Sequence, residues 1–326
     1  MKHVAIIVPD NGSADGVFDA SIFFTWVNHY LNATYQDPLD VQMVGLTKQV
    51  KLNNGLFAVN ADTSLKQTKT QYDLILIPSI AGDFKELIRI NKPFLPWIVQ
   101  QYEGGAEVAS LCLGVFLLAA TGLLNGKECP VHWFAANEFA DMFPEVNVVN
   151  DKIITQQDKI YSSASGVSHW NLLLYFLERF AGREAAIAAS KFFALDINRN
   201  SQLPFVIFNG KKSHNDEPIK QAQNYIEKNF TTKLTIEDLA IRFAIGKRHF
   251  ERRFKKATNN TPVEYIQRVK IEAAKRQLEM GKKTVNEVMY DVGYSDRQAF
   301  RTVFSKIVGM TPSEYRKKFN KDAVEV

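Results

Sequence analysis

The chain has 326 residues, which exceeds one typical domain and suggests two or three. Its charges are unevenly distributed: residues 218–326 hold 23 Lys and Arg against 13 Asp and Glu, whereas residues 1–217 hold 17 against 22. The two cysteines, Cys112 and Cys129, lack metal-ligand spacing, which predicts neither a disulfide framework nor a metal site and fits a reducing cytoplasm.

The N-terminal part alternates strand and helix patterns. The first apolar run, at 3–8, is too short for a secretory signal and is typical of a buried strand. Further buried strands are predicted at 41–46, 73–78 and 107–111, a hairpin centred on Asn150 and Asp151 at 146–155, and helices at 17–31, 85–102, 113–121 and 168–181. This alternation predicts a doubly wound, flavodoxin-like parallel sheet with ligands near the carboxyl ends of its strands.

One uncharged stretch, 108–126, is long enough to raise the question of a membrane span. Gly114, Gly122 and Gly126 interrupt it, so a buried strand, a tight turn and a buried helix explain it better. We therefore predict no contact with a membrane.

Cys112 lies between a predicted strand and a predicted helix, with Gly114 two residues later. This is the layout of a nucleophile elbow, and the start of a helix favours a thiolate. A packed, inert cysteine is the alternative. The best partner for a reactive thiol is His132, with Asp15 or Asp19 as an acid, but no spacing secures these pairs. We favour a structural, half-buried His132.

The first loop, 9–16, has neither GxGxxG nor the lysine of a phosphate-binding loop, so no nucleotide cofactor is predicted. Residues 209–218 are polar, contain Gly and Pro, and are interpreted as a linker. The predicted organisation is an α/β domain at 1–208, a linker at 209–218 and a helical domain at 219–326.

The helical domain contains one two-helix pattern twice. Residues 235–243 match 284–292 at an offset of 49, and the offset becomes 50 after the turn, where Phe250 and Phe254 match Phe300 and Phe304. Such a duplication indicates one structural unit used twice. In each copy the apolar residues face inward and leave a polar outer face on the second helix.

That outer face is the one that a helix-turn-helix unit presents to base edges in the major groove. Arginine can bind guanine, and glutamine can bind adenine, through two parallel hydrogen bonds. The basic charge of residues 218–326 supports a nucleic-acid partner. We therefore predict that the chain binds double-stranded DNA.

Residues 219–319 resemble an AraC-type DNA-binding domain, including both two-helix units, the linking helix at 263–280 and the closing Gly309-Met-Thr-Pro-Ser-Glu-Tyr-Arg. Glu251 departs in charge from the polar residues common at its position. It could accept a hydrogen bond from cytosine or pair with Lys255 or Lys247, and we favour the pairing. By position, the resemblance implies that the base-facing residues are Arg248, Glu251 and Arg252, then Arg297, Gln298, Arg301 and Thr302.

The N-terminal part resembles the PfpI/ThiJ amidase-like domain of the class I glutamine amidotransferase-like superfamily. The specific core is Cys112-Leu-Gly-Val-Phe-Leu-Leu-Ala-Ala-Thr-Gly-Leu-Leu-Asn-Gly-Lys127, supported by the segments at 131–133 and 163–166. Many enzymes of the superfamily carry histidine directly after the cysteine, where this chain has Leu113. The two resemblances together imply the arrangement of GlxA-like transcriptional regulators.

The leading hypothesis is therefore a cytoplasmic, sequence-specific transcriptional regulator that is not an enzyme. Its N-terminal domain would sense an unidentified small molecule, dimerise, or do both, and RNA polymerase would be a further partner. The alternatives are a bifunctional protein with Cys112-dependent amidase or related thiol chemistry, and an architectural DNA-binding protein with an inert N-terminal domain. The candidate ligand pocket comprises Cys112, Leu113, His132 and Asp15.

Overall fold

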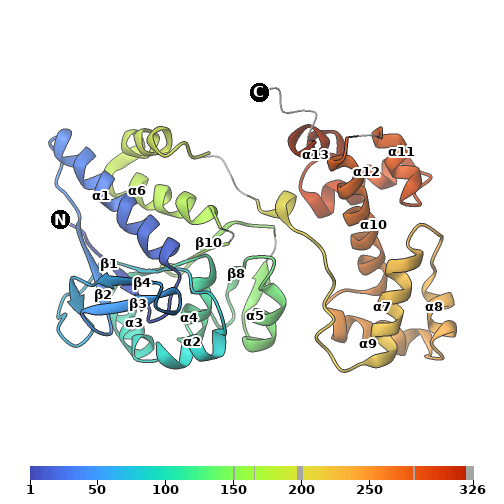
Figure 1. Cartoon of the computed structure of the whole chain (residues 1–326), viewed down its shortest axis with the longest axis horizontal. Coiled ribbons are helices and arrows are strands. Elements are labelled where there is room, and N and C mark those ends of the chain that lie inside the picture. Colours follow the sequence, from blue (N-terminus) through green and yellow to red (C-terminus); the bar gives the residue numbers. More distant parts are fainter. Residues whose placement is uncertain (150, 165, 197–200, 282, 321–326) are drawn as a thin grey trace. The chain divides into compact units, whose positions relative to one another are not determined.

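The computed structural model describes residues 1–149, 151–164, 166–196, 201–281 and 283–320. The chain forms two compact units, Met1–Gln202 and Leu203–Val326. The first combines a sheet with helices, and the second is built from helices (Figure 1). Of the helices in the described part of the chain, none is long and apolar enough to cross a membrane.

The first unit is built on a seven-stranded sheet in the order β10-β11-β7-β6-β1-β2-β5, in which only β10 runs antiparallel to its neighbour. Its central strands are buried on both faces, as predicted for a parallel sheet. In β6, for example, Leu74 and Leu76 join one core and Ile75 and Ile77 join the other. The strands are β1 (His3–Val8), β2 (Asp40–Gly45), β5 (Thr63–Ser64), β6 (Leu74–Ile77), β7 (Glu107–Leu111), β10 (Ile154–Gln157) and β11 (Ile160–Ser163).

Helices cover both faces of this sheet, so the predicted doubly wound fold is confirmed (Figure 1). One face carries α1 (Ala14–Ala33) and α6 (Ser168–Phe192), whose regular geometry is interrupted at Gly182. The other carries α2 (Phe84–Ile90), α3 (Phe94–Glu103), α4 (Val115–Ala120) and α5 (Ala136–Met142). The single helix predicted at 85–102 is wrong: it is two helices, because Pro93 lacks the N–H needed to continue the first.

The hairpin predicted at 146–155 is also wrong. Within that range, β9 (Asn147–Val149) pairs in parallel with β8 (Glu128–Pro130), whereas β10 pairs with β11. The observed hairpin turns at Asp158 and Lys159, both with positive φ (50° and 62°), the geometry favoured in two-residue hairpin loops. Asn150 lies outside the described residues. A second, small hairpin joins β3 (Gln49–Leu52) to β4 (Phe57–Asn60).

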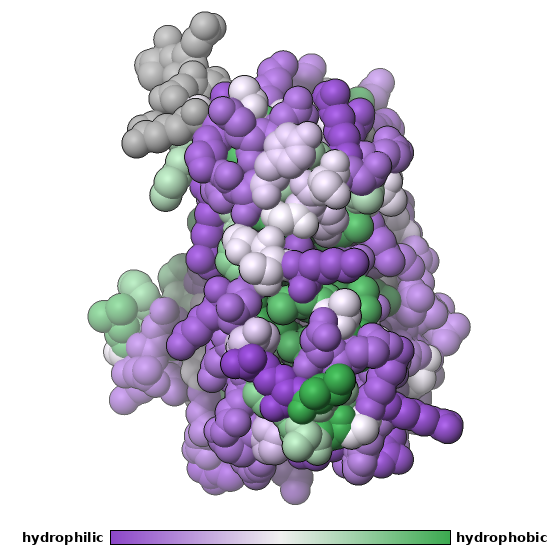
Figure 2. Space-filling view, turned by 90° about the vertical axis from the view of Figure 1, so that its right-hand side faces the viewer, coloured by the Kyte–Doolittle hydropathy of each residue, from purple (hydrophilic) through white to green (hydrophobic). Residues whose placement is uncertain are grey.

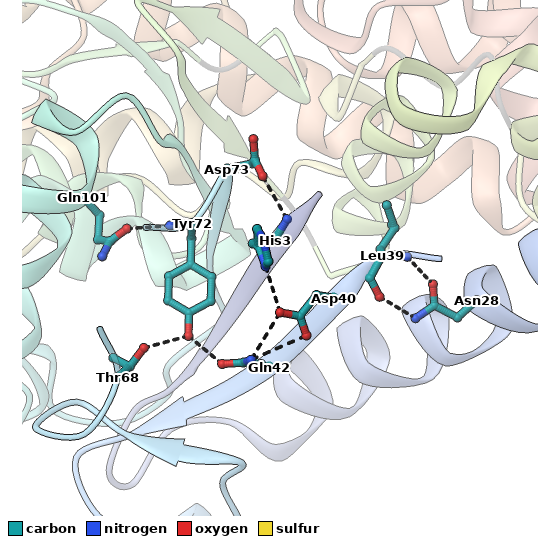
Figure 3. A network of polar contacts seen from close by, with 9 residues as sticks. All are labelled: His3, Asn28, Leu39, Asp40, Gln42, Thr68, Tyr72, Asp73 and Gln101. Atoms are coloured by element: carbon teal, nitrogen blue, oxygen red, sulfur yellow. Dashed lines mark hydrogen bonds and ion pairs between the residues drawn. The ribbon is translucent and has the colours of Figure 1, made fainter. Parts of the chain in front are cut away.

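A polar network joins the strands at the amino end of the sheet (Figure 3). The backbone N–H of His3 donates to Asp73 at 2.8 Å, and His3 Nδ1 lies 2.8 Å from Asp40 Oδ2. Tyr72, which precedes β6, donates through its hydroxyl to Gln42 on β2 at 2.8 Å. These contacts fix the amino edge; Cys112 follows β7 at the opposite, carboxyl edge.

The second unit repeats one helical arrangement. The turn from α8 to α9 contains 243–246, and the turn from α11 to α12 contains 292–296, which confirms the predicted extra residue in the second copy. Its helices are α7 (Glu217–Asn229), α8 (Ile236–Arg242), α9 (Lys247–Thr258), α10 (Pro262–Glu279), α11 (Val285–Asp291), α12 (Arg297–Val308) and α13 (Pro312–Phe319).

Helix α10 contributes to two small cores and so connects the copies. Tyr265 and Ile266 near its start pack with α7, α8 and α9, whereas Ile271 and Leu278 pack with α11, α12 and α13. Capping boxes begin α10, α11 and α13, each with a threonine whose hydroxyl accepts the backbone N–H of a glutamate three residues later.

The boundary between the units differs from the predicted linker at 209–218. Leu203 to Phe208 belong to the helical unit, where the Phe208 N–H donates to Glu272 at 3.1 Å and Lys275 donates to the Val206 carbonyl. Further along, Asp216 caps α7 and forms an ion pair with Arg253 at 2.7 Å. Residues 209–218 have the composition of a flexible linker, and the sequence does not reveal that Asp216 has a partner distant in the chain.

Candidate DNA-reading face and ligand site

Helix α9 has the two-sided character that a DNA-reading helix needs. Phe250 and Phe254 are fully buried against α7, α8 and α10, which fixes the rotation of the helix about its axis. That rotation leaves Arg248, Glu251 and Arg252 exposed. All three predicted residues therefore lie on the solvent side of one rigid helix.

Helix α12 repeats the arrangement. Phe300 and Phe304 are fully buried, and Asp296 caps the first turn by accepting the N–H of Ala299. The four residues predicted to face DNA in this copy are all exposed: Arg297, Gln298, Arg301 and Thr302.

The two turns differ in length by one residue but share a left-handed residue just after the first helix. Ala244 and Gly293 occupy equivalent positions and both have positive φ, 51° and 76°. At Gly293 a side chain is also excluded by space, because a Cβ would lie 2.2 Å from the Thr231 carbonyl oxygen. Lys270 of α10 donates to the Gly293 carbonyl at 3.0 Å and ties the second turn to the linking helix.

The pairing of Glu251 with Lys247 or Lys255 that we favoured from the sequence is wrong. Lys247 contacts Glu237 on α8, and this hydrogen bond is the main reason why the pKa of Lys247 is raised. The charge of Glu251 also raises the pKa of Lys247, but its effect is smaller than that of Glu237. Among the described residues, no hydrogen bond or salt bridge holds the Glu251 carboxylate.

The surface of the helical unit seen in Figure 2 is hydrophilic over most of its area, with a few apolar patches. Ile241 of α8 and Tyr290 of α11 hold equivalent positions in the two copies, and they are 79% and 64% exposed. Beside Ile241, an apolar depression of about 270 Å³ is lined partly by Ala240, Ala244 and Ile245.

In the first unit, Cys112 occupies the strained turn that the sequence predicts. Its φ is +50°, in the left-handed region, and its N–H donates to Ser163 Oγ at 3.4 Å at the end of the neighbouring strand β11. Gly114 lets this turn pack closely, because a Cβ there would lie 2.3 Å from the Ile77 carbonyl oxygen. Cys112 and Leu113 are both buried, at 6% and 8% exposure.

Cys129 has a different environment. It is fully buried in the core beneath α4 and α5, and burial raises the pKa of its thiol to about 12. Cys129 therefore remains a neutral, packed thiol at physiological pH.

His132 and Asp15 each contact residues close to them in the chain. His132 is half-buried between Trp133 and Phe134, and its Nδ1 accepts the Phe134 N–H at 3.4 Å. Burial lowers the pKa of His132, which keeps the imidazole neutral. Asp15 is exposed at the start of α1 and accepts from the Ser13 hydroxyl. The structural role predicted for His132 stays a prediction.

A polar contact between α1 and α6 was missed in the sequence. His169 Nε2 lies 2.8 Å from Asp19 Oδ2; the His169 side chain is 4% exposed and that of Asp19 is 29% exposed. His169 is the second residue of α6, the helix that follows β11. Strand β11 pairs with β7, which directly precedes Cys112. Because 150 residues separate the partners, no local pattern could have indicated the pair.

In the described part of the chain, no group of three or more His, Cys, Asp or Glu residues is arranged to hold a metal ion. At the carboxyl edge of the sheet, the Cys112 turn lies beside Ser163 at the end of β11.

Two protein families match this chain, one in each of its two units. Residues 21–179 match the DJ-1/PfpI family, and residues 239–318 match a helix-turn-helix domain. A solved structure from Vibrio parahaemolyticus shares the fold over 59% of this chain and 98% of its own, with a TM-score of 0.53 at 17% identity.

Two of the curated relatives match over stretches longer than either unit, and a third matches over a shorter stretch. The chain is 27% identical over 218 residues to the HTH-type transcriptional regulator ArgR of Pseudomonas aeruginosa, covering 67% of this chain and 66% of the relative. It is 24% identical over 268 residues to CdhR of the same organism, covering 82% and 78%. The bifunctional transcriptional activator/DNA repair enzyme AdaA of Bacillus subtilis is 39% identical over 106 residues, covering 32% of this chain and 50% of AdaA.

The fold and these matches define a two-domain protein in which a DJ-1/PfpI domain precedes an AraC-type helix-turn-helix domain. This order of domains is the GlxA-like arrangement, and the relatives ArgR and CdhR are HTH-type transcriptional regulators. The match spans just under two thirds of the length of ArgR, at 66%.

Proposed function

We propose that the protein regulates transcription by inserting α9 and α12 into successive major-groove segments of one DNA site. The observation that carries this proposal is the duplicated unit, which exposes Arg248 and Arg252 in one copy and Gln298 and Arg301 in the other. Segments on one face of DNA repeat after one turn, roughly 34 Å. Two reading helices joined by α10 would therefore contact base edges about one turn apart.

Replacement of Arg252 or Arg301 by Ala tests this proposal. Each change should weaken binding to the native operator by about 1–3 kcal/mol and relax specificity at a different position. Footprinting and binding curves at fixed salt measure both effects. Lys228→Ala, which removes an exposed charge from α7, is the control and should leave specificity unchanged. If both arginine variants bind the operator like the wild type, the assigned faces are wrong.

The N-terminal domain is proposed to bind a small-molecule effector beside Cys112 without turning it over. The carboxyl edge of an α/β sheet is the usual place for ligands, and backbone donors after Cys112 suit a carboxylate or amide oxygen. Leu113 replaces the histidine common in related enzymes, and His132 is held within its own loop. A cysteine hydrolase needs a base beside its thiol, and Leu113 stands where many related enzymes carry that histidine.

Purified full-length protein separates this sensor from a bifunctional enzyme. Cys112→Ser should retain DNA binding and alter the response to the effector, whereas a bulky residue such as Trp should abolish that response. Amides, peptides and glyoxal-type compounds are the substrates to assay. Cys112-dependent turnover above about 1 per second, the low end of ordinary enzymes, would establish catalysis and overturn the sensor proposal.

The other proposed partners are a second copy of the chain and RNA polymerase, with the cytoplasm as the proposed location. Dimerisation would join two DNA-reading domains and raise affinity through effective concentration. The exposed Ile241 and Tyr290 supply apolar contact points at equivalent positions, which supports a protein partner on the helical unit.

A further inference from the structure

Glu251 is an acidic side chain on the outer face of a basic helix. It is exposed between Arg248 and Arg252, and among the described residues no hydrogen bond or salt bridge holds its carboxylate. Lys247, the preceding cation at helical spacing, contacts Glu237. In a complex with DNA, an unpaired carboxylate close to phosphates is repelled unless a base offers it a hydrogen-bond donor.

We propose that Glu251 determines specificity by accepting a hydrogen bond from the N4 amino group of one cytosine in the operator. This inference rests on the proposed insertion of α9 into the major groove and adds the base that α9 selects. Glu251 follows Arg248 by three residues, so both side chains project from neighbouring turns of the same exposed face.

The chemistry of the groove favours cytosine over the other bases. Only cytosine N4 and adenine N6 present amino donors in the major groove. Adenine also carries the N7 acceptor beside its amino group, and a carboxylate, which has no donor, is repelled by N7. Guanine and thymine present only acceptors or a methyl group at this edge. A carboxylate therefore discriminates for cytosine, whereas an amide, with both a donor and an acceptor, suits adenine.

The second copy of the unit carries the opposite charge at the same place. Glu251 corresponds to Arg301 at the offset of 50 that relates Phe250 to Phe300, and both residues are exposed. Because the helices α9 and α12 bury equivalent phenylalanines, equivalent positions on their outer faces should approach the groove in the same way. Glu251 would then select cytosine where Arg301 selects guanine, so the two elements of one site are not sequence repeats.

The experiment uses the full chain and a randomised DNA library, followed by binding curves on the selected operator and its single-base variants. Replacing the cytosine read by Glu251 should weaken wild-type binding by about 5-fold to 150-fold. Glu251→Gln should shift the preference at that one base pair from cytosine to adenine. Glu251→Ala should remove the preference while binding non-specific DNA at least as tightly as the wild type, because a repulsive charge is lost.

Glu237→Gln is the charge-matched control, since Glu237 is exposed on α8 and contacts Lys247. It should change non-specific affinity without changing base preference. The inference is overturned if Glu251→Gln and Glu251→Ala select the same base as the wild type at every position. Loss of all sequence preference in the wild type would overturn the proposed function itself, which separates the two failures.

Discussion

At the scale of single residues, the Cys112 turn depends on the absence of a side chain two residues away. A Cβ at Gly114 would lie 2.3 Å from the Ile77 carbonyl oxygen and 2.4 Å from that of Pro78. Both obstacles are backbone atoms at the end of β6 and directly after it, so neither can move without shifting the strand end. The geometry at Cys112 is thus set by the packing of its neighbours.

Gly114→Ala should therefore destabilise the first unit by about 1–3 kcal/mol or more, the usual cost of overpacking. Thermal unfolding followed by tryptophan fluorescence is the measurement, because all four tryptophans, Trp26, Trp97, Trp133 and Trp170, precede residue 203. The matched control is Gly166→Ala, where a Cβ would have no atom within 4 Å and stability should change little. Equal stability of the two variants would contradict this reading of the turn.

The sequence predicted where some site residues lie but not which residues they contact. Cys112 could be placed because an apolar run ends directly before it and a glycine follows at close spacing. The partners of Asp19 and Lys247 could not, because His169 and Glu237 approach them only through tertiary packing of separate helices. A charge pattern along one helix favoured Glu251 for Lys247, but the neighbouring helix supplies the closer carboxylate.

At the scale of elements, the first residues of the helical unit, at 203–208, are held to α10 by a buried ion pair. Glu272 and Lys275 of α10 lie 3.0 Å apart with side chains 11% and 5% exposed, and they bind the backbone of Phe208 and Val206. Buried charges require such partners, because an unpaired one is costly. Apolar residues 203–208 gave no indication of which core they join, which explains the misplaced domain boundary.

Asp216, the N-cap residue of α7, forms an ion pair with α9, and this ion pair makes the stability of the helical unit depend on pH. Its hydrogen bonds from Arg253 on α9, at 2.7 and 2.9 Å, are the main reason why the pKa of Asp216 lies below its ordinary value of 3.8. Stability from a carboxyl group with a depressed pKa is present above its unfolded-state pKa and is lost as the pH falls through the folded-state pKa.

Asp216→Asn should therefore cost about 1 kcal/mol or less at pH 7, since both partners are partly exposed, and progressively less below about pH 4. Urea unfolding of the full chain, followed by circular dichroism at pH 7 and pH 3, gives the difference. Glu217→Gln, in the same first turn, is the control. An equal loss at both pH values would show that the charge on Asp216 is not responsible.

The two-helix units were predictable as elements because apolar spacing, capping threonines and the duplication all agree. The edge of the sheet was less predictable. The residues around Asp158 and Lys159 are polar, so the short strands β10 and β11 have little apolar signal, and Asn150-Asp151 offered a competing turn. Local patterns identify a turn but do not decide which strand pairs with which.

At the scale of the whole molecule, an apolar surface on the first unit suggests how two chains associate. Ile22 of α1 is 56% exposed, Phe192 of α6 is 64% exposed, and Phe18 is 37% exposed. The Trp26 ring lies 5.2 Å from that of Phe192, and Trp26 follows Phe18 and Ile22 at four-residue spacing along α1. Clustered exposed aromatic and aliphatic side chains are typical of protein contacts, and a second copy would also bring two DNA-reading domains together.

We therefore expect the full chain to sediment as a dimer at tens of micromolar, a concentration ordinary for such interfaces. Ile22→Glu should place a charge in the interface, shift the protein toward monomer and weaken operator binding, because the two readers no longer share one effective concentration. Gln100→Glu introduces the same charge at an exposed position on α3, on the other face of the sheet, and should change neither property. A wild-type chain that sediments as a monomer would refute dimerisation, whereas a dimeric Ile22→Glu variant would move the interface elsewhere on the first unit.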